Sequence, residues 1–329
     1  MLQLRVIELS LVSLALTLLA SCGGAPESPA QAAANYPARP ITWLVAFDPG
    51  GGSDFEARRL QRALEEKLGT SIHIQYRQGG GGAVGWSELA KQKPDGYTVG
   101  GLVIPHFIIQ PLALESIGYT TEELRPVAWN VSAPAALLVA ENSQFQTMEQ
   151  FMTYARDHPG ELTVGGTATF SLSDLALAQL MDSSGVDVDY VPIAGGGGPL
   201  IAGLRGGHLD AGMLGTPHGV RSDGIRILAV GGSERFVTLP DVPTFAELGY
   251  EVTIEFAWGV GVPAGTPDAI ATRLGNAVIE VMKETGADKA VLEEGLSPLL
   301  IGPDRAPQYA TEQKATYQKL MPFLEKLSR

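Results

Sequence analysis

The sequence predicts an α/β fold in which mostly parallel strands alternate with helices. From Tyr36 onward, short runs of β-branched residues alternate with helical patterns of ten or more residues. Of the 329 residues, 45% are hydrophobic and 40 are glycine. Strands and helices that alternate in this way form parallel sheets, and glycines suit the tight turns between them. The apolar content also excludes a disordered chain.

The first hundred residues predict a βαβαβ unit. The first helix has Ala57, Leu60 and Leu64 on one face and ends at Gly69, which is a typical helix stop. The expected strands cover 41–47, 71–77 and 97–104, and a second helix covers 84–92.

A second unit begins at 135 and would make two domains in series. Its expected strands cover 135–139, 161–165, 186–193, 209–214 and 225–230, and its helices cover 172–181 and 200–205. The last third predicts helices at 270–282, 290–294 and 303–326. Because this third has too few strands for a core of its own, we expect its helices to pack on an earlier sheet.

The charge balance argues against nucleic acid as a partner. The chain has 23 Lys and Arg against 36 Asp and Glu, a net charge of −13, and no basic cluster that would bind phosphates. A single cysteine excludes a disulfide framework and a metal site built from several cysteines. Beyond the N-terminus, no stretch approaches the roughly 20 apolar residues that span a bilayer.

The N-terminus reads as a secretory signal peptide over residues 1–21. Arg5 precedes an apolar run at 9–20 that is too short to span a membrane. The sequence Leu19-Ala20-Ser21-Cys22 resembles the bacterial lipobox, which implies lipid attachment at Cys22 and an anchored extracytoplasmic protein. The alternative is a plain signal peptide with an incidental cysteine. Residues 22–35 then form a flexible tether rich in Gly, Pro and Ala.

Four glycine-rich loops share one design, in which a strand ends, glycines follow and a helix begins. They cover 48–54, 78–85, 165–171 and 194–199. The first turn of a helix presents N–H groups without partners, and the carboxyl ends of strands are where α/β sheets bind ligands. Each loop is therefore a candidate anion site. The alternative is a helix cap, because Ser53 with Glu56 and Ser171 with Asp174 fit capping boxes.

The candidate ligand contacts come mainly from these loops. Amides of the first two loops would capture a carboxylate, and the other two loops would close over it. Asp54 also fits a structural role, because a carboxylate is stabilised at a helix N-terminus. The candidates are Phe47, Gly51, Gly52, Ser53, Asp54, Gly80, Gly81, Gly82, Ala83, Thr167, Phe170, Ser171, Gly195, Gly196 and Thr216.

Patterns typical of enzymes are weak. Gly80, Gly82 and Gly85 satisfy a dinucleotide fingerprint, but the next strand ends in Pro105-His106 without the acid that binds ribose. A nucleotide-dependent enzyme is therefore only the alternative. The five histidines lack metal-ligand spacing, no G-x-S-x-G elbow is present, and His106 alone is placed to line a pocket. We expect no catalytic residue, metal or cofactor, and we assign the tryptophans to the core or a crevice wall.

Several motifs in a fixed order resemble the Bug receptors, the extracytoplasmic substrate-binding proteins of tripartite tricarboxylate transporters. The resemblance runs from about Tyr36 to the C-terminus. Its motifs are Tyr36-Pro37-Ala38-Arg39-Pro40-Ile41, Phe47-x-Pro49-Gly50-Gly51, Pro94-Asp95-Gly96-Tyr97-Thr98, Pro159-Gly160, Val191-Pro192, Leu239-Pro240-Asp241-Val242-Pro243-Thr244, Glu247-x-Gly249 and Pro263-Ala264-Gly265-Thr266-Pro267.

This resemblance implies a two-lobed fold like that of type II periplasmic binding proteins, with a mostly parallel sheet flanked by helices in each lobe. Residues 36–134 and 235–329 would form lobe 1, and residues 135–234 lobe 2. It also implies a monomeric periplasmic receptor, not an enzyme, that closes on a small organic acid and delivers it to a membrane permease. A receptor that senses a carboxylate without transporting it is the alternative.

Two departures from the family pattern affect the ligand. The chain has Asp174 where the family commonly has His, and Ile193-Ala194 where Tyr and Lys commonly follow Val-Pro. Both changes make the wall of lobe 2 less basic or more apolar. The sequence leaves open a monocarboxylate with an apolar body or a dicarboxylate with one end held by water.

Overall fold

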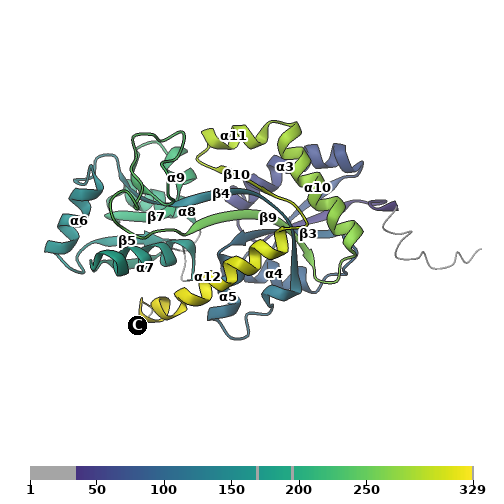
Figure 1. The fold of residues 1–329 in the computed structure, drawn as a ribbon, viewed down its shortest axis with the longest axis horizontal. Helices are drawn as coiled ribbons and strands as arrows, with labels where there is room; N and C mark the ends of the chain where they lie inside the picture. The colour runs from purple at the N-terminus through teal and green to yellow at the C-terminus, as the bar shows by residue number, and fades with distance from the viewer. Residues whose placement is uncertain (1–34, 168–169, 194–195, 328–329) are drawn as a thin grey trace, which may run out of the picture. The chain divides into compact units, whose positions relative to one another are not determined.

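The computed structural model describes residues 35–167, 170–193 and 196–327 (Figure 1). The predicted signal peptide, Cys22 and Gly195 lie outside these residues. Ten strands form one sheet with the order β2-β1-β3-β9-β4-β7-β5-β6, and β8 and β10 also pair with β4. Among the described residues, no helix is long and apolar enough to cross a membrane.

The first half of the sheet follows the predicted βαβαβ unit. Strands β1 (Ile41–Val45), β2 (Ile72–Tyr76) and β3 (Thr98–Ile104) run parallel, and helices α3 (Gly52–Leu68) and α4 (Ala83–Ala90) connect them. Helix α3 buries its apolar face and ends at Gly69, whose φ of 70° places it in the left-handed region. Glycine adopts this conformation without strain, so the predicted stop is confirmed.

The second half repeats this arrangement. Its parallel strands are β5 (Thr163–Gly166), β6 (Asp189–Pro192) and β7 (Ala211–Gly215). The helices that follow β5, β6 and β7 are α7 (Leu172–Ser184), α8 (Gly197–Arg205) and α9 (Thr216–Val220).

Two long antiparallel strands join the halves, so the expectation of two domains in series is wrong. Strand β4 (Leu124–Ala140) pairs with β9 (Glu255–Pro263) up to Pro134, and from Ala135 it pairs with β7 and β8 (Ile225–Val230). The change of partner falls at the predicted lobe boundary. The division of the chain into the predicted lobes stays a prediction.

The last third supplies two strands that the sequence analysis missed. Strand β9 is buried on both faces and therefore shows no alternating pattern, and β10 (Ser297–Ile301) pairs with β4 near Trp129. The three helices predicted for the last third are present, and they pack on β4, α3 and α7, among other elements. They are α10 (Asp268–Glu284), α11 (Ala287–Glu293) and α12 (Ala306–Leu327).

Three further helices and two short turns were also missed, and one of these helices is the short α9 that follows β7. Helix α5 (His106–Ala113) begins directly after Pro105 and contains a proline, and α6 (Met148–Asp157) begins at the cap Thr147. The short 3₁₀ turns are η1 (Gly80–Gly82) and η2 (Thr121–Glu123).

The crossing of β4 and β9 leaves no room for a side chain at Gly259. A Cβ there would lie 2.6 Å from the Trp129 ring and against the Ala128 carbonyl oxygen. In contrast, a Cβ at Gly101 in β3 would make ordinary contacts, with the Trp43 indole nitrogen 3.6 Å away. Trp129 is fully buried and donates a hydrogen bond to the Ala306 carbonyl, so it cannot move aside at low cost.

We therefore expect Gly259→Ala to lower the free energy of unfolding by about 1–3 kcal/mol, the usual cost of overpacking. Gly101→Ala is the matched control, because it also adds a methyl group within the sheet, and it should change stability by less than about 1 kcal/mol. Urea unfolding of both variants measures the difference. Equal stability of the two variants would contradict the close packing at Gly259.

Candidate ligand-binding site

The strand register makes the loops of the two halves face one another. Strand β3 runs in the direction of β4 and ends at Ile104, which is level with Ala257 and Ser132. Strand β7 runs against β4 and ends at Gly215, which is level with Ala135. The two strand ends are thus three residues apart along β4, about 10 Å at 3.3 Å per residue. The predicted anion loops follow the parallel neighbours of these two strands, which are β1 and β2 in the first half and β5 and β6 in the second.

The first loop offers two free main-chain donors. Gly51 is the N-cap of α3, and the N–H groups of Gly52 and Ser53 in its first turn have no partner among the described residues. The Gly50 N–H is already used, because it donates to the Asp54 carboxylate at 2.8 Å. The donors available to a ligand are therefore those of Gly52 and Ser53.

The second loop offers another pair. The N–H groups of Gly80 and Gly81 have no partner within the described part of the chain, whereas Gly82 and Ala83 donate within the turn. The side-chain amide of Gln110 donates to the carbonyls of Gly80 and Gly81 at 3.2 and 3.1 Å. These hydrogen bonds from Gln110 occupy the two carbonyl oxygens and hold the loop, with its two N–H groups, in place.

The loops of the second half are supported by polar and aromatic side chains. Gly196 has a φ of 84°, and the ring of His218 occupies the space that a side chain at Gly197 would need. The Thr167 N–H donates to Ser173 Oγ at 3.3 Å, and Phe170 N–H donates to Asp174 at 2.9 Å. These contacts account for the glycine at 197 and fix the end of β5.

Four rings form a continuous row beside the first-half loops, and we call them the aromatic row: Phe47, His106, Phe256 and Trp258. Their centroids are 5.9 Å apart for Phe47 and His106, 5.7 Å for His106 and Phe256, and 5.1 Å for Phe256 and Trp258. The row extends from Gly52 to Gly215, because side chains at these glycines would meet Trp258 and Phe256 at 3.1 and 2.9 Å. Phe47 was predicted for the site, and His106 was singled out as a pocket residue.

His106 is an uncharged ring at neutral pH. It is 5% exposed, it stacks on Phe256 with an interplanar angle of 8°, and burial lowers its pKa to about 4. Its Nδ1 is enclosed and has no hydrogen-bond partner among the described residues. A buried polar atom without a partner is costly, so this nitrogen calls for an explanation beyond packing.

Several predicted contacts have structural partners already. Burial raises the pKa of Asp54, but hydrogen bonds from Gly50 and Tyr76 and the charge of Arg58 outweigh this and leave the pKa lowered. The Thr216 hydroxyl is fully buried and donates to the Gly295 carbonyl at 2.6 Å.

The two alternative capping boxes differ in outcome. Ser53 does not cap its helix, whereas Ser171 caps α7 by accepting from the Asp174 N–H at 3.4 Å. The Ser53 hydroxyl is therefore not used by the cap proposed for it.

An ion-pair network that the sequence did not reveal links the halves beside the site. Glu56 on α3 is buried, which raises its pKa, and it accepts hydrogen bonds from Arg59 and from Asn130 of β4. Arg59 reaches Glu294 at 2.6 Å, and Glu294 also pairs with Arg221 at the end of α9. The network fixes the start of α3, which carries the donors of the first loop, against the second half.

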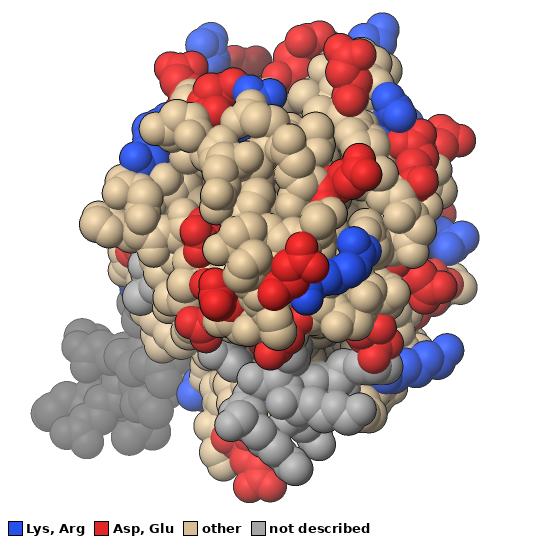
Figure 2. Space-filling model, turned by 90° about the vertical axis from the view of Figure 1, so that its left-hand side faces the viewer, with Lys and Arg blue, Asp and Glu red and all other residues tan. Residues whose placement is uncertain are grey.

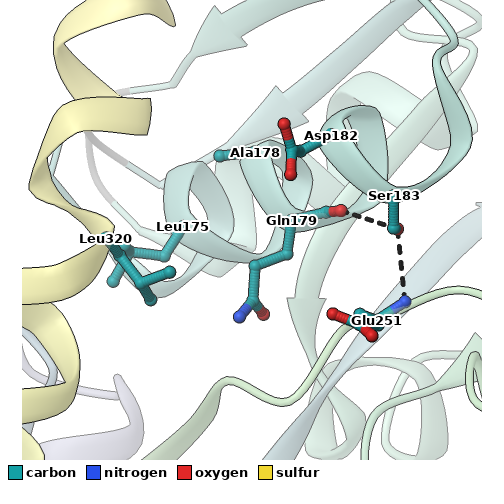
Figure 3. A pocket seen from close by; sticks show the side chains of 7 residues that line it. All are labelled: Leu175, Ala178, Gln179, Asp182, Ser183, Glu251 and Leu320. Atoms are coloured by element: carbon teal, nitrogen blue, oxygen red, sulfur yellow. Dashed lines mark hydrogen bonds between the residues drawn. The ribbon is translucent and has the colours of Figure 1, made fainter.

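A separate pocket of about 160 Å³ lies on α7, where Leu320 of α12 approaches Leu175 (Figure 3). Asp182 and Glu251 line it, and two carboxylates repel an anion. This pocket does not suit an organic acid. On the molecular face shown in Figure 2, the Lys and Arg side chains are scattered among acidic ones and form no basic patch.

Comparison with known proteins identifies the class. The model of the tripartite tricarboxylate transporter family receptor matches residues 56–325. Protein BugT of Bordetella pertussis is 31% identical over 288 residues, which cover 84% of this chain and 87% of BugT.

Solved structures show the same fold. The structure of R. palustris Rpa4515 with adipate has a TM-score of 0.82 and 27% identity, and the match covers 88% of this chain and 98% of that one. The structure of MatC from Rhodopseudomonas palustris with bound malate has a TM-score of 0.77 at 24% identity and covers 87% and 99% of the two chains. The fold is that of a periplasmic binding protein, as predicted.

This chain belongs to the tripartite tricarboxylate transporter receptor family, which includes the Bug proteins. Its members are periplasmic solute-binding receptors that bind small organic acids and work with transporter permeases. The resemblance seen in the sequence is confirmed.

The buried His106 predicts a specific acid sensitivity. The unfolded chain takes up a proton on His106 near its ordinary pKa of 6.5, whereas the folded protein resists protonation until about pH 4. The contribution of His106 to stability is therefore lost as the pH falls from 6.5 to 4, by up to about 3 kcal/mol. His106→Phe should remove this loss, which urea unfolding at pH 7 and pH 4.5 measures.

The control is His158→Phe, which replaces a histidine that also stacks on an aromatic ring but lies outside the aromatic row. It should keep the acid sensitivity of the wild type. An unchanged pH dependence in His106→Phe would show that His106 does not titrate as its burial requires.

Proposed function

We propose that this protein captures a small organic acid between the facing loops and delivers it to the permease of a tripartite tricarboxylate transporter. The observation that carries the proposal is the set of free N–H groups at Gly52, Ser53, Gly80 and Gly81. Main-chain N–H groups at the start of a helix and in a glycine turn suit a carboxylate, whose two oxygens accept several hydrogen bonds. Adipate in the similar protein Rpa4515 supports an acid as the ligand.

Capture by the first half would be followed by closure of the second. A ligand closes a receptor only when it binds the closed form better than the open one. The Gly196 N–H group and the Thr167 hydroxyl, which is buried without a partner among the described residues, would provide this difference together with the first turns of α7 and α8. Strand β4 pairs with strands of both halves, so it would carry the hinge motion.

The proposed receptor has no catalytic activity, because members of its family bind substrates without transforming them. The glycines of the dinucleotide-like run also have structural reasons. A Cβ at Gly85 would lie 2.7 Å from that of Ala46, and one at Gly82 would lie 2.6 Å from the Trp86 ring. Close packing of Gly85 against Ala46, next to β1, and of Gly82 against Trp86 of α4 thus accounts for these two glycines without a nucleotide.

We further propose that Cys22 carries a lipid that anchors the protein at the membrane, and that residues 22–35 tether the folded part. The support is the lipobox-like sequence Leu19-Ala20-Ser21-Cys22. Labelling of expressing cells with a radioactive fatty acid tests this. Label that persists in Cys22→Ser would overturn it.

Gly51→Asp tests carboxylate capture, and the tight contact of its added Cβ with the Asp48 carbonyl oxygen, at 3.2 Å, is shared by the control Gly51→Asn. Gly51 has φ −83° and is the N-cap of α3, a position that favours Asp and Asn. The new carboxylate at position 51 would lie about 5 Å from the carboxylate of the ligand. Because like charges at this distance repel each other, even at an effective dielectric constant near 20, binding should weaken about 100-fold. Calorimetric titration with the acid that stabilises the wild type best measures the change.

Gly51→Asn is the matched control, because it has the same shape and capping ability without the charge. It should lose less than about tenfold in affinity. Equal affinity of the Asp and Asn variants would remove this loop from the site. Stabilisation by nucleotides or sugars, with none by any carboxylate, would contradict the proposed function itself.

A further inference from the structure

The aromatic row places apolar surface where the body of a bound acid must lie. Trp258 is 7% exposed and lies beside Gly52, one of the free donors, and Phe256 lies beside Gly215 at the opposite strand end. Phe256 and Trp258 are two residues apart on β9 and so project from the same face. An acid held by Gly52 and Ser53 would therefore extend along ring faces.

A ligand with a second carboxylate would need a positively charged partner, but the arginine side chains near the site are already paired. Arg58 donates to Asp54 and Tyr76, and Arg59 and Arg221 share Glu294. His218, which supports the loop at Gly197, has its pKa lowered by burial and is uncharged at neutral pH. A second carboxylate would thus lose its hydration without gaining a charged partner, which is unfavourable.

His106 is the polar group within this apolar row. Of its two ring nitrogens, only Nδ1 is both enclosed and without a partner among the described residues. Burying an acceptor atom without a hydrogen-bond partner costs less free energy than burying an N–H group without one. We therefore assign the proton of the neutral ring to Nε2, which leaves Nδ1 as the acceptor. This nitrogen can then receive one hydrogen bond from a hydroxyl O–H group.

We propose that the bound acid carries a single carboxylate on a flat aromatic body, and that His106 is a specificity-determining residue that hydrogen-bonds a ring hydroxyl of this acid. The inference rests on the function proposed above. Glycines at 52, 81 and 215 let Trp258, Gln110 and Phe256 pack directly against the loop and strand-end backbone, because a Cβ at each would lie within 3.1 Å of these side chains. Main-chain N–H groups would hold the carboxylate, and the rings would stack on the body.

Calorimetric titration of the purified protein at pH 7 with benzoate, the three hydroxybenzoate isomers, adipate, malate and citrate tests this ranking. We expect one hydroxybenzoate to bind at least tenfold more tightly than malate or citrate, and more tightly than benzoate. In His106→Phe, which keeps the ring, benzoate should bind within threefold of the wild type. The preferred hydroxybenzoate should lose its advantage over benzoate.

His158→Phe should keep the full wild-type ranking, since that histidine lies in α6 outside the aromatic row. Tighter binding of malate, citrate or adipate than of every aromatic acid would overturn this inference and leave the proposed function standing. Binding of no acid on the panel would overturn both. If His106→Phe does not fold, the wild-type ranking alone decides the ligand class, and His106→Gln tests the hydrogen bond.

Discussion

The antiparallel pairing of β4 with β9 is the constraint on which the rest of the structure depends. This pair borders the parallel strands of both halves, because β9 pairs with β3 and β4 pairs with β7. Its register brings the ends of β3 and β7 to within three residues of each other along β4. Gly259 allows the close approach, since even a methyl group would meet Trp129. The loops of the two halves therefore follow strands whose carboxyl ends point toward each other along the sheet.

An acidic protein can hold an acid when local donors outweigh distant charge. The net charge is −13, yet the groups proposed to bind the acid are main-chain N–H groups and uncharged rings. Carboxylates close to the site are neutralised, as in the pairs of Asp54 with Arg58 and of Glu56 with Arg59. Charges farther away than about 8–10 Å are screened at ordinary salt. In the proposed site, the aromatic row would then supply the selectivity.

Local patterns could be predicted from the sequence, and long-range partners could not. Strand β8 has the predicted bounds 225–230, because one run of apolar residues between turn signals defines it. Strand β9 was missed because burial on both faces and Gly259 and Gly261 remove the alternation. The strand–glycine–helix loops were visible, since each is a local signal. The aromatic row and the link from Arg59 to Glu294, 235 residues away, exist only after folding.

The central claim is that main-chain donors of the first half hold a carboxylate. A crystal structure of the protein with its tightest-binding acid tests this most directly. The account predicts both carboxylate oxygens within about 3 Å of the nitrogens of Gly52, Ser53, Gly80 or Gly81, the usual length of such hydrogen bonds. A carboxylate held instead by an arginine or lysine side chain, or an acid bound away from the facing loops, would contradict it.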